Sequence, residues 1–282
     1  MHQNNLHNKN YNLKELTKSE DILAQFIIKG KKGNQTIDFS NPVAVKALNT
    51  ALIRKYYGIK YWSFPDENLC PPIPGRVDYI HYLADLIGKK IKNPKILDIG
   101  IGATAIYPLL GQTIYKWAFV GTDVDKKTIE TATKIVKRNK LESKIALRLQ
   151  TDKSKIFKGI INPGEQYAAS MCNPPFFKSL EEANEANQRK QKNLGIDSKE
   201  RNFGGKNNEL CYPGGEKAFL HNYLYESSLY KDQVNWFTIL VSNKKHVKGM
   251  YISLKKLEAT KIRTIEMRLG NKVSRVVAWT FK

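Results

Sequence analysis

The sequence predicts an α/β protein built on a doubly wound, mostly parallel β-sheet, and three observations support this fold class. From Pro94 onward, short apolar runs alternate with helix-like segments. Their spacing is that of strand-helix-strand units, which form parallel pairs with crossover connections. The last two strand-like runs are joined by only a few residues, which predicts an antiparallel hairpin. We expect a main domain at 94–282, preceded by a helical extension at 1–93.

Five strands are expected in the main domain, at the runs KILDIG, WAFVGTD, IALRLQ, YAASMC and VNWFTILVS. Helices are expected between them, at KKTIETATKIVKRNK and EKAFLHNYLYESSLYK. The terminal runs TKIRTIEMRL and SRVVAWTFK, joined by GNKV, predict a hairpin at the sheet edge. Residues 178–215 contain few apolar positions, so we expect a long mobile insertion over the face where ligands bind.

The extension contains two predicted helices. The first begins at Pro42 and continues through VAVKALNTALIRKYY, where apolar residues recur at helical spacing. The prolines of CPPIPGR predict an extended stretch, and VDYIHYLADLIGKKI then predicts a second helix that ends in a basic turn. The first forty residues are polar and are compatible with either an ordered arm or a loose tail.

The composition favours a polyanionic partner. Lys and Arg total 47 against 26 Asp and Glu, a formal net charge of +21, so nucleic acid is favoured first and an anionic membrane surface second. Cys70, Cys172 and Cys211 lack metal-ligand spacing, as do the five histidines, so we expect no metal and a reducing compartment. No run approaches the ~20 apolar residues of a membrane span. We therefore expect a soluble, cytoplasmic protein.

A glycine turn predicts a nucleotide-type cofactor site. In ILDIGIGATAIYPLLG, Asp98 ends a strand, Gly100 and Gly102 allow a tight turn, and a helix with free N–H groups follows. Asp123 ends the next strand about twenty residues later, as expected for a carboxylate that accepts hydrogen bonds from ribose hydroxyls. Because Gly100, Gly102 and Ala105 also match the dinucleotide fingerprint, these residues leave NAD and S-adenosylmethionine both open.

The stretch MCNPPFFKSL favours amine methylation. Each proline fixes its φ angle and removes a backbone donor, so the Asn173 side-chain oxygen and the Pro174 carbonyl form two acceptors on a rigid frame. Two such acceptors suit the two hydrogens of an amine whose lone pair is delocalised. With Pro175, they form the expected catalytic loop, and Phe176 offers a stacking face for a planar base. NAD chemistry needs no such arrangement.

These motifs, together with several longer ones, carry a family resemblance along nearly the whole chain. They are IDFSNPVAVKALNTALI, CPPIPGRVDYIHYLADL, ILDIGIGATAIYPLLG, CNPPF, NFGGKNNEL, GGE, WFTILVS and RVVAWTF. The sequence resembles the adenine-N6 methyltransferases of large-subunit ribosomal RNA, the RlmF type, which act on adenine 1618 of 23S rRNA. It is similar, more distantly, to the eukaryotic U6 small nuclear RNA adenine-N6 methyltransferases.

The resemblance implies a Rossmann-like class I methyltransferase fold, S-adenosyl-L-methionine as donor, S-adenosylhomocysteine as product and RNA adenine N6 as acceptor. The Arg76 guanidinium suits a bidentate bond to the methionine carboxylate. By position, the resemblance places Asp152 or its neighbour Thr151 at the cofactor as well. The full expected cofactor set is Arg76, Asp98, Gly100, Gly102, Thr104, Asp123 and Asp152, and the expected catalytic set is Asn173, Pro174, Pro175 and Phe176. Glu216 is expected only to begin a helix.

The expected partner is 23S rRNA or a large-subunit assembly intermediate, with the target adenine single-stranded or flipped. Basic residues in the extension, in KKTIETATKIVKRNK and in the C-terminal tail are all candidates for phosphate contacts, and we expect a monomer. One alternative is a protein glutamine N-methyltransferase, because a side-chain amide fits the same pair of acceptors. Another is a non-catalytic RNA-binding protein on a methyltransferase fold, which the retained motif residues disfavour. The product of a methylation assay discriminates these readings.

Overall fold

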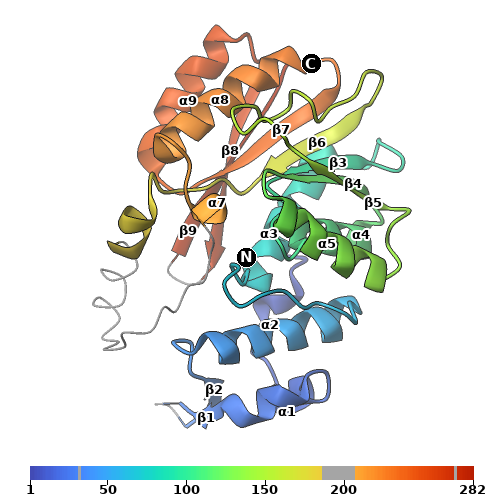
Figure 1. Ribbon diagram of the computed structural model, residues 1–282, viewed down its shortest axis with the longest axis vertical. Helices are drawn as coiled ribbons and strands as arrows, with labels where there is room; N and C mark the ends of the chain where they lie inside the picture. The colour runs from blue at the N-terminus through green and yellow to red at the C-terminus, as the bar shows by residue number, and fades with distance from the viewer. Residues whose placement is uncertain (31–32, 186–206, 270–271) are drawn as a thin grey trace.

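The computed structural model describes residues 1–30, 33–185, 207–269 and 272–282, and it contains a seven-stranded sheet of order β5-β4-β3-β6-β7-β9-β8 (Figure 1). Pairing is parallel from β5 to β7, and β9 is antiparallel to both β7 and β8. The predicted fold class and the C-terminal edge hairpin are therefore confirmed. The strands are β3 (Lys95–Ile99), β4 (Ala118–Asp123), β5 (Ile145–Leu149), β6 (Tyr167–Cys172), β7 (Val234–Val241), β8 (Lys261–Leu269) and β9 (Lys272–Thr280).

The helices cover both faces of this sheet because strand side chains alternate between faces. Ile96 of β3 packs in one buried cluster with α3, α4 and α5, whereas its neighbour Leu97 packs in a second cluster with α8 and α9. Figure 1 shows these two helix groups in separate layers beside the strands. The helices are α3 (Ile73–Ile87), α4 (Ile106–Tyr115), α5 (Lys126–Arg138), α7 (Asn207–Leu210), α8 (Gly215–Leu229) and α9 (Lys244–Lys256).

Strand register brings the sequence-predicted motifs to one edge of the sheet. Asp98 of β3 lies opposite Gly121 of β4 and Met171 of β6 in the two parallel ladders. Parallel strands end on the same side, so the glycine turn, Asp123 and the NPPF loop all follow strand ends at the carboxyl edge. Open α/β sheets bind ligands at this edge.

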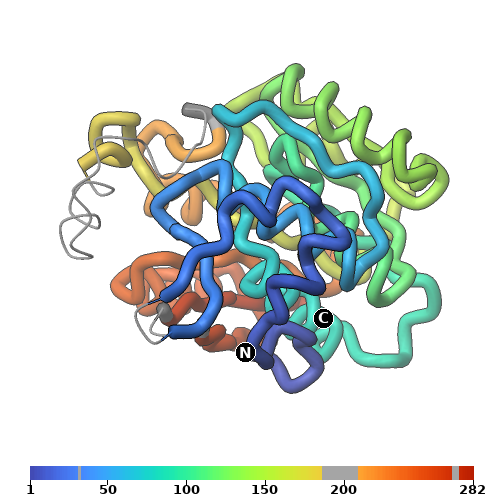
Figure 2. Tube along the Cα trace, turned by 90° about the horizontal axis from the view of Figure 1, so that it is seen from below, coloured from blue at the N-terminus to red at the C-terminus, as the bar shows by residue number. Residues whose placement is uncertain are grey.

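The N-terminal segment is an ordered arm at one end of the molecule (Figures 1 and 2). Its first residues dock on α3, where the backbone N–H of His2 and the amide of Asn5 both donate to the buried Asp78 carboxylate. In α2 (Pro42–Tyr57), Asn41 caps the first turn and Gly58 ends the helix at φ +66°. The other elements of the arm are η1 (Leu6–Asn8), α1 (Leu13–Thr17), η2 (Asp21–Phe26), β1 (Ile27–Lys29) and β2 (Gln35–Ile37).

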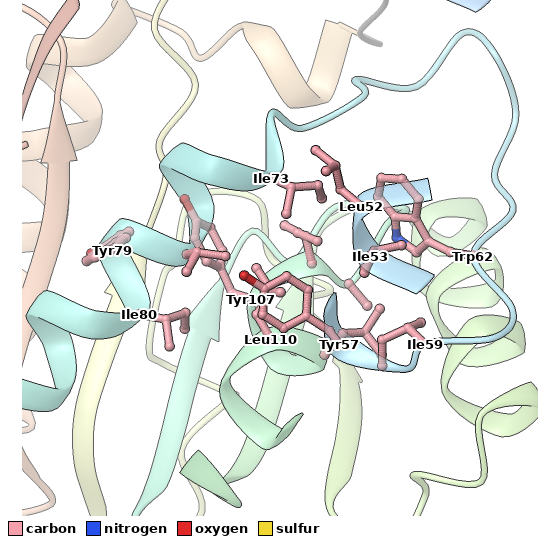
Figure 3. Close-up of a cluster of buried hydrophobic side chains, with 14 of the residues drawn as sticks. Leu52, Ile53, Tyr57, Ile59, Trp62, Ile73, Tyr79, Ile80, Tyr107 and Leu110 are labelled. Carbon is pink, nitrogen blue, oxygen red and sulfur yellow. The ribbon is translucent and has the colours of Figure 1, made fainter. Parts of the chain in front are cut away.

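One hydrophobic core joins this arm to the sheet. Figure 3 shows side chains of α2, α3 and α4 packed together, including Ile53, Ile80 and Leu110, which are all fully buried. Trp62 also belongs to this cluster, and its indole N–H donates to the Thr104 carbonyl at 3.0 Å, next to the glycine turn. The segment that follows α2 therefore packs directly against the glycine turn. The domain division at residue 94 stays a prediction.

Three details differ from the sequence-based expectations. The predicted extended stretch at CPPIPGR is wrong in its second half, because α3 already begins at Ile73 and Pro74 is tolerated in the first helical turn. The same helix ends at Ile87 with Gly88 as its C-cap, so Lys89 and Lys90 lie outside it. Helix α9 was not predicted from its Lys-rich sequence. Of the predicted insertion at 178–215, residues 186–206 lie outside the described residues.

Candidate active site

A cavity of about 700 Å³ opens at the carboxyl ends of β3, β4 and β6. Of the predicted site residues, the structure brings seven together in its wall. They are Arg76, Gly100, Gly102, Thr104, Asp123, Asn173 and Pro175. The wall also includes Leu69, Pro71, Tyr107, Gln150, Lys153, Ser154, Lys155, Ile156, Lys178, Glu209, Tyr212, Ala218, Phe219 and Asn222.

The glycine turn has the conformation that its sequence requires. Gly100 and Gly102 have φ angles of +75° and +66°, in the left-handed region that favours glycine. The N–H groups of Gly100 and Ile101 both donate to the Thr122 carbonyl, at 2.9 and 2.8 Å, which ties the turn to β4. The backbone of the turn therefore faces the cavity without a side chain at either glycine.

Asp123 is fixed by backbone donors on both of its oxygens. Oδ2 accepts the Gly102 N–H and Oδ1 accepts the Asp125 N–H, each at 3.1 Å. Burial raises the pKa of Asp123 to about 6, while these two hydrogen bonds oppose the rise. At neutral pH the carboxylate is mainly ionised and lies in the cavity wall, where it can accept hydrogen bonds from a pair of hydroxyl groups.

Asp98 lies beneath the cavity wall rather than in it. Its side chain is fully buried, and neither carboxyl oxygen has a hydrogen-bond partner among the described residues. Burial, followed by repulsion from Asp123, raises the pKa of Asp98 to about 8, and attraction to Arg76 opposes this rise. A buried carboxyl without a partner is costly to fold, which makes Asp98 a candidate for a functional role.

Arg76 projects into the cavity from the first turn of α3. Its Nη1 donates to the Tyr107 hydroxyl at 2.8 Å, and its guanidinium carbon lies 5.4 Å from the centre of the Tyr107 ring. Its buried Nε has no hydrogen-bond partner in the described parts of the chain. Arg76 in the cavity wall suits the carboxylate of a zwitterionic amino acid, and the Asp98 carboxyl beneath the wall, which is attracted to Arg76, favours the ammonium of such a ligand nearby.

Together these residues fit S-adenosylmethionine. Arg76 and Asp98 match its charged amino-acid end, Asp123 matches its ribose hydroxyls, and the glycine turn allows close approach of the backbone. The cavity volume lies within the range of small-molecule sites. Most of the wall surface is apolar, and polar side chains from several elements converge on it, as in cofactor sites.

The NPPF loop follows β6 directly and divides between the cavity and the protein interior. Asn173 and Pro175 line the cavity, whereas Pro174 is buried and Phe176 is half-buried outside the lining. Among the described residues, none forms a hydrogen bond with the Asn173 side chain, so its oxygen is available to a substrate there. Beyond the loop, the Phe177 N–H donates to the Leu210 carbonyl and its carbonyl accepts the Tyr212 N–H, both at 2.9 Å.

Asp152 and Thr151 are both exposed and lie outside the cavity lining. Oδ1 of Asp152 accepts the backbone N–H and the hydroxyl of Ser154, at 2.9 and 2.7 Å, and these bonds lower the pKa of Asp152. The carboxylate therefore shapes its own loop. The neighbouring residues Gln150 and Lys153 reach the cavity instead.

Several wall residues had no role in the sequence-based site. Tyr107 follows the glycine turn by five residues, so its place in the first turn of α4 was a usable signal. Glu209 accepts the Leu69 N–H at 3.1 Å and the Asn68 amide at 3.2 Å, and thus joins α7 to the linker before α3. Glu209 lies near the end of the predicted insertion at 178–215. No local sequence pattern predicts that a residue there lies close to the distant glycine turn.

The chain is similar to known proteins along its whole length. The model of a family described as RNA methyltransferase matches residues 1–282. Proteins named ribosomal RNA large subunit methyltransferase F match over 100% of this chain. The one from Flavobacterium johnsoniae is 48% identical with 93% of its length covered, and the one from Christiangramia forsetii is 47% identical with 100% covered.

Two solved structures also match over 100% of this chain. The hMettl16 catalytic domain in complex with MAT2A 3'UTR hairpin 1 has a TM-score of 0.88 and 29% identity, with 96% of that chain covered. The N-terminal domain of human METTL16 in complex with SAH has a TM-score of 0.82 and 26% identity, with 99% covered. Within the described ranges of our chain, no helix is long and apolar enough to cross a membrane, and no His, Cys, Asp and Glu cluster suits a metal.

Proposed function

The chain belongs to the RNA methyltransferase family whose model spans it, and on this premise we propose that it methylates the exocyclic N6 of one adenine in 23S rRNA, adenine 1618 by its resemblance to the RlmF type. It is a methyltransferase enzyme with S-adenosylmethionine as cofactor and S-adenosylhomocysteine as product. The two matched structures support both parts, since one is described as an RNA complex and the other as a complex with SAH.

The observation that carries the proposal is the position of Asn173. Its side chain lies in the same cavity as the glycine turn, Arg76 and Asp123, at the end of the central strand β6. A side-chain oxygen with no partner among the described residues, on a frame stiffened by two prolines, suits one hydrogen of an amine. The Pro174 carbonyl is the second acceptor in this proposal.

The two acceptors address the chemical difficulty of this reaction. The lone pair of the adenine amine is delocalised into the ring, and the amine is therefore a weak nucleophile. When bound, S-adenosylmethionine supplies a methyl carbon attached to a positively charged sulfur. Asn173 and Pro174 hold the amine hydrogens out of the ring plane, so the nitrogen lone pair points at that carbon, and the surplus amine proton leaves to solvent. Positioning and electrostatics provide the rate in this mechanism.

Adenine must leave its stack to reach the cavity. We infer that Phe176 provides a ring face for the flipped base, a contact worth ~1–3 kcal/mol. The surplus of 21 positive charges favours binding of the RNA phosphates around it.

The test is incubation of the protein with labelled S-adenosylmethionine and unmodified 23S rRNA, followed by nucleoside analysis. We expect label in N6-methyladenosine, and we expect an rRNA with guanine at position 1618 to take up none. Label in another nucleoside, or at glutamine in a protein fraction, would overturn the proposal.

A variant locates the chemistry at Asn173. We expect Asn173→Ala to lower turnover at least about a hundredfold, because it removes one acceptor for the amine hydrogens. Cofactor affinity should stay within a few-fold, since the contacts of Arg76, Asp98 and Asp123 are unchanged. Full turnover in this variant would exclude the two-acceptor mechanism.

A further inference from the structure

One buried carboxylate outside the cavity holds part of its wall. Glu226, in the fourth turn of α8, is 6% exposed, and its oxygens accept backbone N–H groups of three consecutive residues. Oε2 accepts from Ile156, Phe157 and Lys158 at 3.2, 2.9 and 3.1 Å, and Oε1 accepts from Ile156 at 3.1 Å. A buried carboxylate is costly unless its oxygens accept hydrogen bonds, and these N–H groups supply them.

The three donors belong to residues 150–158, the first part of the connection between β5 and β6 and here named the β5–β6 loop, and five residues of this loop line the cavity. Gln150, Lys153, Ser154, Lys155 and Ile156 all line it. The loop is closed by its own hydrogen bonds as well. The Gln150 amide donates to the Lys158 carbonyl at 2.9 Å and its oxygen accepts the Asp152 N–H at 3.0 Å. Glu226 therefore anchors a loop that is already internally rigid.

Helix α8 supplies the adjoining wall with the same face that carries Glu226. Ala218, Phe219 and Asn222 line the cavity, and Glu226 follows Asn222 by four residues, one helical turn further along. The carboxylate itself does not line the cavity. Two neighbouring walls, from distant parts of the chain, are thus held together at one side chain.

We propose that Glu226 is a positioning residue for cofactor binding, which acts by fixing the β5–β6 loop against α8 without touching the ligand. This inference rests on the proposed use of the cavity for S-adenosylmethionine. It also accounts for Asp152 and Ser154, whose mutual hydrogen bonds shape the loop that Glu226 anchors. Loss of the anchor should misplace the cavity wall and weaken cofactor binding more than turnover at saturation.

Two variants separate the hydrogen bonds from the packing. Glu226→Met fills a similar volume but offers the three N–H groups no strong acceptor, and we expect the Kd for S-adenosylmethionine to rise about tenfold or more. Glu226→Gln keeps one oxygen acceptor, which can retain the bonds now made by Oε2, but it loses the acceptor at Oε1, so we expect a smaller rise of roughly threefold. In both variants we expect kcat at saturating cofactor to stay within about threefold of wild type.

Hydrogen exchange supplies a readout that general destabilisation would not reproduce. We expect faster exchange at the amides of Ile156, Phe157 and Lys158 in Glu226→Met, with little change in the strands, at a temperature where the variant is folded. Glu165→Gln is the matched control. Glu165 is also a hydrogen-bonded acidic residue, since it accepts the Asn162 N–H at 2.9 Å and pairs with Arg148, but it does not line the cavity.

The outcomes are distinct. Wild-type cofactor affinity in folded Glu226→Met, or an equal loss in Glu165→Gln, would overturn the positioning role. If Glu226→Met did not fold, the exchange of the three amides and the Kd in Glu226→Gln would decide, and unchanged values of both would overturn it. A wild-type chain that binds cofactor but leaves adenine unmethylated would count against the proposed reaction alone, whereas one that binds no cofactor would overturn both.

Discussion

Asp98 and Glu226 are both buried carboxyl groups beside the same cavity, and they are treated in opposite ways. Glu226 has four short contacts from backbone N–H groups, whereas neither oxygen of Asp98 has a hydrogen-bond partner among the described residues. Burial raises the pKa of Asp98 to about 8, with no hydrogen bond to oppose it. The Glu226 carboxylate is satisfied by backbone groups of the protein, whereas the Asp98 carboxyl has no hydrogen-bond donor among the described residues.

A structural acid can be distinguished from a functional one by its hydrogen-bond partners. Hydrogen bonds to a buried carboxylate lower the free-energy cost of burying it. A buried carboxyl without hydrogen bonds lowers the stability of the protein, and such groups occur mainly at functional sites. Burial alone does not separate the two groups, because both are almost fully buried. Their hydrogen-bond partners do.

The largest effect is expected for Asp98→Asn, which keeps the size of the side chain and removes its charge. We expect the affinity for S-adenosylmethionine to fall at least about a hundredfold, since the ligand ammonium loses a buried ionic partner. The free energy of unfolding of the ligand-free protein should rise by on the order of 1 kcal/mol at pH 8, because no buried carboxyl then opposes folding. Titration calorimetry and urea denaturation measure the two effects, and unchanged affinity would contradict a binding role for Asp98.

The opposite effect on stability is expected at Glu226. In Glu226→Met, three buried backbone N–H groups lose their acceptor, and we expect the free energy of unfolding to fall by about 2 kcal/mol. Urea denaturation of the ligand-free protein measures this loss. A variant as stable as wild type would show that water or another group satisfies these amides, and the contrast with Asp98 would disappear.

Cofactor binding should depend on pH through Asp98. The ligand ammonium needs the ionised carboxylate, whose pKa in the free protein is about 8, so below pH 8 a proton must leave on binding. We expect the Kd to decrease as pH rises from 6 to 8, by up to about tenfold, or 1.4 kcal/mol, per pH unit. Near pH 6 ionisation of Asp123, whose pKa is about 6, adds to the effect. Asp98→Asn should retain only the Asp123 contribution, and calorimetry across this pH range checks both proteins.

The smallest effect is expected at Glu165, a hydrogen-bonded acid that touches no part of the cavity. Arg148 and the Asn162 N–H lower the pKa of Glu165, so its stabilisation is present above the normal glutamate pKa and is lost as pH falls through the lowered value. We expect Glu165→Gln to cost about 1 kcal/mol or less at pH 7, as ion pairs near the surface usually do. Thermal denaturation at pH 7 measures it, and a larger loss would place Glu165 with Glu226.

The sequence predicted most of the strand positions because each strand is a short apolar run between helical segments. It missed α9, whose sequence KKHVKGMYISLKK buries only Met250 and Leu254 and has a weak apolar face. It also placed the start of α3 too late, because the prolines of CPPIPGR were interpreted as extended chain when one of them lies within the first helical turn. At the start of α3 and in α9, packing against the rest of the protein determines the helix more than the local sequence does.

The candidate site was predictable where function follows directly from a strand end. Asp98, Gly100, Asp123 and Asn173 are all within a few residues of β3, β4 or β6, and parallel strands bring such positions together. Glu209 and Glu226 were out of reach, since their roles depend on partners 50 to 150 residues away in the chain. Only the folded structure supplies those partners.

The backbone bridge between Phe177 and residues 210–212 has a consequence for the evolution of the chain. It joins the residue that follows the NPPF loop to the residues that precede α8 through backbone groups alone. These bonds do not depend on the side chains, so residues 177, 210 and 212 can be substituted without loss of the pairing. Proline at position 177 or 212 is the exception, because it removes the N–H that donates.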